Sequence, residues 1–259
     1  GAAQASGRPV ALVCTSGTAA ANYHPAVAEA DLSAIPLILL TADRPPELRG
    51  IGAGQTIDQI KLFGGAVRFF SEVGNHQADD DGLIHFRSLA CRAFAAAAGD
   101  PRPGPVHLNF PLRDPLAPIP VDDDVTATRR LALEGRPDGP LTRIEQSTCG
   151  AERPAVTRLV AMIQAAERIL ILAGRQPDPA LREPLARLAN ACRAPVLAEP
   201  TSQFRVGPHD RGAVITAYER IAARREPSLA PDLVIRLGEF PTSKRLRLWL
   251  TEVEPAQIV

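Results

Sequence analysis

The stretch 39-LLTADRPPEL-48, which continues into 55-QTIDQ-59, decides the fold. It begins as the end of an apolar run, 35-IPLILL-40, and changes at once into a charged segment with two prolines. Because proline fits neither a strand ladder nor a helix interior, the strand has to end here. Asp43 and Arg44 are therefore expected at the carboxyl end of a strand, the edge where open α/β sheets bind ligands. A guanidinium there can hold a carboxylate or phosphate, and an Asp-Arg pair that only closes a turn is the alternative.

A second strand end precedes this one. The continuously apolar run 9-PVALVC-14 is typical of a parallel strand buried on both faces, and it leads into 15-TSGT-18 and a helix-compatible run, 19–30. This order of strand, small polar turn and helix offers free N–H groups and hydroxyls to a polar or anionic ligand. A plain N-cap role for Thr15 or Ser16 is equally compatible with the pattern.

The remaining apolar periods predict further strands and helices. In the first half we expect helices at 19–31, 55–63 and 83–98 and strands at 35–41, 67–73 and 105–110, the last with a less apolar face because it contains His107 and Asn109. In the second half we expect helices at 155–165, 179–192, 217–223 and 243–250 and strands at 168–173, 194–198 and 232–237. Residues 74–82, which include three adjacent aspartates, are expected to form a solvated loop.

The predicted fold class is therefore α/β, with two doubly wound parallel-sheet units. We expect one domain at 1–120, a linker at 121–153, where prolines and scattered charge interrupt any period, and a second domain at 154–259. The turn after the strand at 168–173 has a single glycine, so the dinucleotide-binding fingerprint is not met.

The composition excludes several classes of protein. Lys plus Arg equals Asp plus Glu, at 29 each, so no basic field favours nucleic acid or an anionic membrane. No apolar run approaches the length of a membrane-spanning helix, and a cytoplasmic location is expected. The four scattered cysteines predict reduced structural thiols rather than a metal site: Cys14, Cys91, Cys149 and Cys192. The chain begins and ends close to apolar strands, which predicts an internal fragment of a longer protein.

Taken together, these motifs resemble one enzyme family. The segments TSGTAAAN at 15–22, LTADRPPELR at 40–49 and GAGQTIDQIKLFG at 52–64 closely resemble the 2-succinyl-5-enolpyruvyl-6-hydroxy-3-cyclohexene-1-carboxylate synthases, thiamine-diphosphate enzymes of menaquinone biosynthesis. The segment GPVHLNFPLRDPL at 104–116 resembles the end of the same domain, and AGR at 173–175 and GEFPTSKRLRLWL at 238–250 resemble the family's middle domain. The resemblance is densest up to about residue 117.

The resemblance implies the C-terminal part of a pyrimidine-binding domain at 1–120 and a middle domain, truncated or whole, at 154–259. It implies a transferase that decarboxylates 2-oxoglutarate and adds the succinyl carbanion equivalent to isochorismate, with thiamine diphosphate and Mg²⁺ or Mn²⁺. The expected assembly is a cytoplasmic homodimer or homotetramer, without nucleic acid or membrane insertion. The family's catalytic glutamate is expected upstream of Gly1 and its metal-binding segment downstream of Val259, so this chain alone is expected to be inactive.

The resemblance also implies the site residues. Thr18 and Asn22 match the turn near the cofactor's aminopyrimidine. Both substrates are dianions, and the positions that match the family's substrate-binding residues are Arg44, Gln55, Lys244 and Arg245. Relatives often have Asn or Pro where this chain has Gly54, so any side-chain contact from that position is lost here.

Lys244 and Arg245 are unusual on physical grounds as well. They begin a predicted helix capped by Thr242 or Ser243, where cations face the positive end of the helix dipole at a cost of ~0.3–1 kcal/mol each. A bound carboxylate would remove this conflict, and the plain alternative is that both side chains turn into solvent.

Two other functions remain open at this point. One is another thiamine-diphosphate-dependent decarboxylase or carboligase of the acetolactate synthase type, which usually has a proline-glycine turn in place of these motifs. The other is a non-catalytic anion-binding α/β protein.

Overall fold

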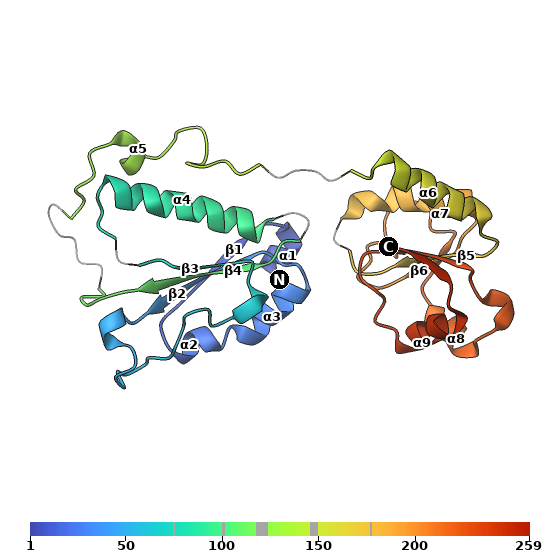
Figure 1. Ribbon diagram of the computed structural model, residues 1–259, viewed down its shortest axis with the longest axis horizontal. Helices are drawn as coiled ribbons and strands as arrows, with labels where there is room; N and C mark the ends of the chain where they lie inside the picture. The colour runs from blue at the N-terminus through green and yellow to red at the C-terminus, as the bar shows by residue number, and fades with distance from the viewer. Residues whose placement is uncertain (75, 100–101, 118–123, 146–149, 177) are drawn as a thin grey trace. The chain divides into compact units, whose positions relative to one another are not determined.

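The structure is a computed structural model that describes residues 1–259 apart from 75, 100–101, 118–123, 146–149 and 177 (Figure 1). The chain divides into two compact units, Gly1–Thr148 and Cys149–Val259. The first unit contains α1 (Ala2–Ser6), β1 (Val10–Cys14), α2 (Thr18–Ala21), α3 (His24–Leu32), β2 (Leu37–Asp43), the 3₁₀ helices η1 (Pro46–Leu48) and η2 (Gly64–Ala66), β3 (Phe69–Glu72), α4 (Asp80–Ala97), β4 (Pro105–Pro111) and α5 (Arg130–Leu133).

The first unit is a parallel sheet in the strand order β1-β2-β4-β3. Helix α4 covers one face and α2 and α3 cover the other (Figure 1). On the α4 face, Leu89 and Ala93 pack with Val106 and Leu108 of β4. On the opposite face, Val27 of α3 packs in a smaller cluster with Leu39 of β2 and with Phe63.

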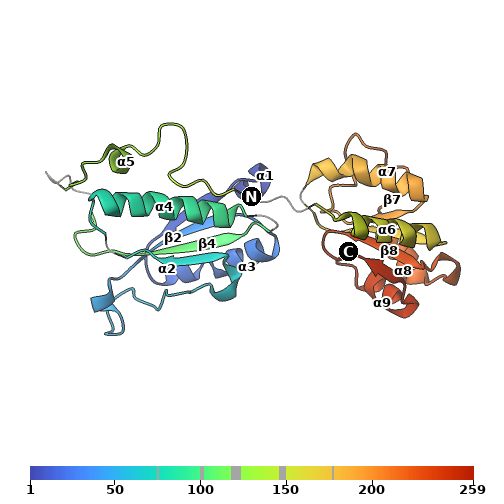
Figure 2. The ribbon, with the colours of Figure 1, turned by 45° about the horizontal axis from the view of Figure 1, so that its top comes forward.

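The second unit contains α6 (Arg153–Ala165), β5 (Ile169–Ala173), η3 (Pro179–Leu181), α7 (Arg182–Cys192), β6 (Val196–Ala198), β7 (Val214–Ile215), α8 (Tyr218–Arg224), η4 (Pro227–Leu229), β8 (Leu233–Leu237), α9 (Lys244–Val253) and β9 (Ala256–Ile258). Its sheet is parallel in the order β7-β6-β5-β8-β9, with α6 and α7 on one face and α8 and α9 on the other (Figure 2). The predicted α/β class with two parallel sheets is confirmed. The short strand β7 was not predicted, and β9 lies at the end of the chain, where an apolar strand was expected.

Two predicted helices differ from the structure. The helix expected at 55–63 is absent, and the chain there forms turns in which Gln55 and Lys61 have positive φ values of 58° and 54°. A left-handed residue interrupts a right-handed helix, so the helix-like spacing of apolar residues was misleading. The helix expected at 19–31 is divided into α2 and α3, because Pro25, in the first turn of α3, has no N–H to continue the hydrogen bonding of α2.

The aspartates of 79–81 begin a helix and are not part of a solvated loop. The Asp79 carboxylate accepts a hydrogen bond from the Gly82 N–H at 2.8 Å and caps α4, and Asp80 and Asp81 occupy its first turn. Asp80 also accepts hydrogen bonds from the N–H groups of Thr128 and Arg129, and these bonds lower the pKa of its carboxyl group. Part of the predicted linker, 121–153, is thereby attached to the first unit.

Strand β4 is buried on both faces, although we expected one face to be less apolar. His107 and Asn109 do share a face, but both are fully buried there.

The hydrogen bonds of Thr41 determine the protonation of His107. The Thr41 hydroxyl donates to the Asn109 amide oxygen, so it accepts from His107, whose Nε2 lies 2.7 Å away. His107 therefore carries its proton on Nε2, and its buried Nδ1 has no hydrogen-bond partner in the described part of the chain. Burial lowers the pKa of His107 to about 4, and the nearby charge of Glu72 opposes this only in part.

The loops that follow β5 and β8 in the second unit approach each other so closely that there is no room for a side chain at the points of contact. Gly174 follows β5 and Gly238 follows β8, and each lies against the backbone of the other loop. A Cβ on Gly174 would overlap the Glu239 carbonyl oxygen, and one on Gly238 would overlap the Arg175 carbonyl oxygen. The pair is tied by the Glu239 N–H, which donates to the Arg175 carbonyl at 3.1 Å. The single glycine that we noted after β5 therefore serves loop packing.

We expect His107 to make the first unit less stable in acid. Its pKa is about 4 in the folded chain and 6.5 ordinarily, so protons bind preferentially to the unfolded chain below pH 6.5. The contribution of His107 to the free energy of unfolding should be complete above pH 6.5. It should fall by up to about 1.4 kcal/mol per pH unit between pH 6.5 and pH 4. Amide exchange of β4 in the wild type and in His107→Gln measures this. Parallel pH profiles for the two proteins would contradict the assignment.

We expect Gly174→Ala to destabilise the second unit by at least about 3 kcal/mol, because two backbones must separate to admit one methyl group. Trp249, the single tryptophan, is buried in this unit, so its fluorescence during urea denaturation reports the loss. Gly150→Ala is the matched control, since a Cβ at Gly150 meets nothing within 4 Å. Equal urea midpoints for Gly174→Ala and Gly150→Ala would show that the stability of the second unit does not depend on the close approach of the two loops.

Candidate functional site

Buried polar side chains form one hydrogen-bond network at the carboxyl end of the first sheet. Asn109 of β4 lies opposite Thr41 in the register of β2 and β4. Its amide oxygen accepts hydrogen bonds from the Thr41 hydroxyl, at 2.8 Å, and from the Gln59 amide, at 2.9 Å. Its amide nitrogen donates to Asp43 and Glu72, at 2.8 and 2.7 Å. All four hydrogen-bonding capacities of the Asn109 amide are therefore used.

Gln59 connects this network to the turn after β1. It is only 1% exposed, and its amide oxygen accepts a hydrogen bond from the Gly17 N–H at 2.7 Å. Its amide nitrogen also donates to the Ala42 carbonyl at the end of β2. Gly17 has a φ of +80°, and a Cβ there would lie 3.0 Å from the Gln55 carbonyl oxygen. The segment 55–59 therefore lies directly over the turn, and only glycine fits beneath it.

Arg49 completes the network at its outer end. Its guanidinium lies 2.7 Å from both Asp43 and Glu72, and its Nε donates to the Arg44 carbonyl at 3.0 Å. The Arg44 N–H donates to Asp43 at 2.7 Å. Asp43 therefore forms its ion pair with Arg49 and not with Arg44, and a ligand role for Arg44 stays a prediction. The backbone of Arg44 is fixed on both sides.

The Arg44 side chain lines a pocket of about 540 Å³. Its Nε lies 3.4 Å from the Gly54 carbonyl, and its guanidinium has no carboxylate partner among the described residues. Arg113, on the same pocket, is held by Glu47 through two hydrogen bonds. Leu112 and other apolar side chains form much of the remaining wall. A pocket of this size that contains a guanidinium without a carboxylate partner can bind a small organic anion.

Gln55 is bonded to the turn that precedes α2. Its amide nitrogen donates to the Thr15 hydroxyl and to the Ser16 carbonyl, each at 3.1 Å, and the Ser16 hydroxyl donates to the Gln55 carbonyl at 3.1 Å. Thr15 and Ser16 are therefore not N-caps, and the residue at that position of α2 is Gly17. The structure brings Gln55 next to the predicted cofactor turn.

Thr18 and Asn22 lie at the two ends of α2. They are four residues apart, so they occupy the same side of the helix, and both are exposed. Neither side chain has a hydrogen-bond partner within the described ranges. A hydroxyl and an amide in this arrangement can donate to and accept from a polar heteroaromatic ring.

Lys244 and Arg245 belong to the second unit, where they begin α9. The Ser243 hydroxyl caps this helix by accepting from the Leu246 N–H at 3.0 Å, which settles the choice between Thr242 and Ser243. Both cations are exposed and have no carboxylate within ion-pair distance in the part of the chain that the structure describes. Their opposition to the helix dipole is therefore not relieved by a direct ion pair.

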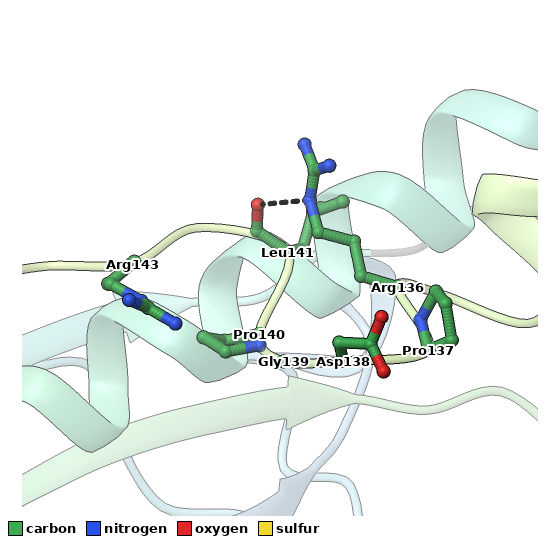
Figure 3. Close-up of a pocket in the computed structure, with 7 residues that line it drawn as sticks. All are labelled: Arg136, Pro137, Asp138, Gly139, Pro140, Leu141 and Arg143. Atoms are coloured by element: carbon green, nitrogen blue, oxygen red, sulfur yellow. Dashed lines mark hydrogen bonds between the residues drawn. The ribbon is translucent and has the colours of Figure 1, made fainter.

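A second pocket, of about 430 Å³, is formed by the loop 136–143 (Figure 3). Its charged side chains, Arg136, Asp138 and Arg143, point in different directions, and Arg136 donates to the Leu141 carbonyl of the same loop. This arrangement does not support ligand binding. Over the described ranges, no group of three or more His, Cys, Asp or Glu residues is placed to hold a metal ion. No described helix is long and apolar enough to cross a membrane.

Sequence reasoning missed the residues that hold the site together. Gln59, Asn109 and Arg49 were within the quoted motifs, but no role was assigned to them. The detectable signal was a run of polar side chains in positions that should be buried, such as Asn109 in a continuous strand. Their partners depend on strand register, which the sequence pattern alone does not specify.

The first unit matches a known protein family, and the fold of the chain is found in a solved structure. Residues 1–62 match the family described as "Thiamine pyrophosphate enzyme, N-terminal TPP binding domain". The fold is shared with benzoylformate decarboxylase from Polynucleobacter necessarius, with a TM-score of 0.62 and 22% identity, over 91% of this chain and 40% of that one. At this identity the likeness concerns the fold alone.

Much closer sequence relatives bear the name 2-succinyl-5-enolpyruvyl-6-hydroxy-3-cyclohexene-1-carboxylate synthase. The protein of Geobacillus thermodenitrificans is 44% identical over 97% of this chain, and that of Halobacterium salinarum is 42% identical over 100%. The chain spans only 42% and 45% of the lengths of these two relatives. Residues 1–62 thus match the N-terminal domain of thiamine pyrophosphate enzymes, and the chain is similar, over nearly its whole length, to part of these synthases.

Proposed function

We propose that this chain is part of a thiamine-diphosphate-dependent synthase that decarboxylates 2-oxoglutarate and adds the succinyl carbanion equivalent to isochorismate. The observation that carries the proposal is the 44% identity, over 97% of the chain, to a protein named as the synthase that makes 2-succinyl-5-enolpyruvyl-6-hydroxy-3-cyclohexene-1-carboxylate. The motifs at 15–22, 40–49 and 52–64 support it, because they form the network and the pocket of the first unit.

The donors and acceptors of the first unit fit one part of the cofactor. Thr18 and Asn22 present a hydroxyl and an amide at an exposed turn, which suits the ring nitrogens and amino group of an aminopyrimidine. Gln59 fixes that turn by accepting from the Gly17 N–H. Thiamine diphosphate, when bound, supplies the nucleophilic carbon and the electron sink for the decarboxylation. We assign Mg²⁺ or Mn²⁺ and the diphosphate group to residues outside this chain.

The cations of the chain are assigned to the dianionic substrates. We assign Arg44, whose main chain is held by Asp43 and Arg49, to a substrate carboxylate that its guanidinium would bind through two parallel hydrogen bonds. Gln55 is assigned to a substrate beside the turn that follows β1, where its amide nitrogen bonds to Thr15 and Ser16. In the second unit, Arg245 is assigned to a further carboxylate and Lys244 acts as a point charge. We propose that the enzyme works in the cytoplasm as at least a dimer.

An assay of the full-length protein tests the function. Carbon dioxide release from 2-oxoglutarate should require thiamine diphosphate, Mg²⁺ and isochorismate together, and the product should carry both carbon skeletons. Turnover of pyruvate in place of 2-oxoglutarate would identify a decarboxylase or carboligase of the acetolactate synthase type. Anion binding without any turnover would identify a non-catalytic binding protein.

Arg44→Ala should lower kcat/KM by about 10- to 100-fold, because a charge-assisted hydrogen-bond pair contributes about 1.5–3 kcal/mol. Arg44→Lys should recover only part of this loss, since an ammonium cannot bind a carboxylate in two parallel bonds. Arg113→Ala is the matched control on the same pocket, where Glu47 already holds the guanidinium. A larger loss in Arg113→Ala than in Arg44→Ala would reverse the assignment.

A further inference from the structure

We infer that Glu199 is a positioning residue that sets the start of α9, and with it Lys244 and Arg245, for substrate binding. The inference rests on the proposed function and adds a residue to it. Glu199 directly follows β6 and is only 5% exposed. Its Oε1 accepts a hydrogen bond from the Thr242 N–H at 2.9 Å, two residues before Lys244. It also accepts a short hydrogen bond from the Tyr218 hydroxyl.

The main chain of Glu199 is fixed independently of its carboxylate. Its N–H donates to the Ala173 carbonyl at the end of β5, at 2.9 Å. Its carbonyl accepts from the Ser202 hydroxyl at 2.6 Å and from the Ser202 N–H at 3.1 Å. The carboxylate therefore extends from a rigid strand end. A group that is rigidly mounted can define the position of the loop that it binds.

Tyr218 is the second support for the carboxylate. It begins α8, is 4% exposed, and packs with Trp249 and Leu250 of α9 in the core of the second unit. Burial raises the pKa of its phenol, and the hydrogen bond to Glu199 raises it further. The phenol therefore remains a donor at neutral pH. One carboxylate thus joins the end of β6, the start of α8 and the residue before the cap of α9.

A purely structural bridge here would not require a charge. A neutral acceptor could bind the Tyr218 hydroxyl and the Thr242 N–H, and a buried carboxylate loses hydration. Glu199 also has no cation within ion-pair distance among the described residues. What the carboxylate adds is negative charge at the N-terminal end of α9, where it interacts favourably with the helix dipole. It thereby offsets the presence of two cations in the first turn.

The test compares four variants in the full-length protein: Glu199→Ala, Glu199→Gln, Arg245→Ala and the double variant Glu199→Ala/Arg245→Ala. Glu199→Ala should raise KM about tenfold for the substrate whose KM also rises in Arg245→Ala, with kcat changed less than twofold. Glu199→Gln keeps an acceptor without the charge and should show a smaller increase. The increase in KM in the double variant should fall well short of the product of the two single increases, because Glu199 acts in part through Arg245.

Amide exchange separates positioning from general stability. Glu199→Ala should speed exchange at residues 242–245 and leave exchange in β8 unchanged. Arg247→Ala is the matched control, since it removes an exposed cation two residues further along α9 and should leave both KM values unchanged.

Several outcomes would overturn the inference. A fall in thermal stability without a change in KM would make Glu199 merely structural. Effects that multiply in the double variant would show that Glu199 acts independently of Arg245. An active wild type with unchanged KM in Glu199→Ala would overturn this inference alone, whereas a wild type without synthase activity would overturn it together with the proposed function.

Discussion

The first unit depends on the hydrogen bonds of one group, the side-chain amide of Asn109. It bonds to Thr41 and Asp43 on β2, to Glu72 on β3 and to Gln59, which in turn bonds to the turn after β1. A buried network of this kind stabilises only when each member is satisfied, because an unpaired buried group costs about 1–3 kcal/mol. Asn109 meets this condition with two donors and two acceptors. The geometry of the carboxyl edge of this sheet is therefore set by a group that has no contact with solvent.

The two units position their cations by the same physical means. In the first, Asp43 and Arg49 hold the main chain of Arg44 and leave its guanidinium free to line a pocket. In the second, Glu199 holds the main chain at Thr242 and leaves the side chains that follow it exposed. In each case a buried carboxylate binds a backbone N–H, and an adjacent cation stays available. Arranging the backbone in advance reduces the entropy lost when a ligand binds.

Apolar periodicity predicted most of the fold, because short continuous runs such as 169–173 between turn signals are typical of buried parallel strands. It failed where one residue overrides the period: Gln55 is left-handed, Pro25 interrupts a helix, and Asp79 caps one. The α/β class and the family resemblance were correct, and the roles of the proposed site residues stay predictions. The network could not be predicted, because pairing Thr41 with Asn109 requires the register of β2 and β4, and those strands are distant in sequence.

That distance also determines when the site can form. The hydrogen bonds of the network join residues 42, 50, 66 and 68 positions apart, from Gly17 to Gln59 and from Thr41 to Asn109. Contacts of such long range form late, because a large loop must close before any of them is made. A growing chain on the ribosome that has not yet produced β4 lacks every hydrogen bond of Asn109 and can make only those between earlier residues, such as Gly17–Gln59 and Arg49–Asp43. The carboxyl edge of this sheet is therefore among the last parts of the unit to become ordered during synthesis.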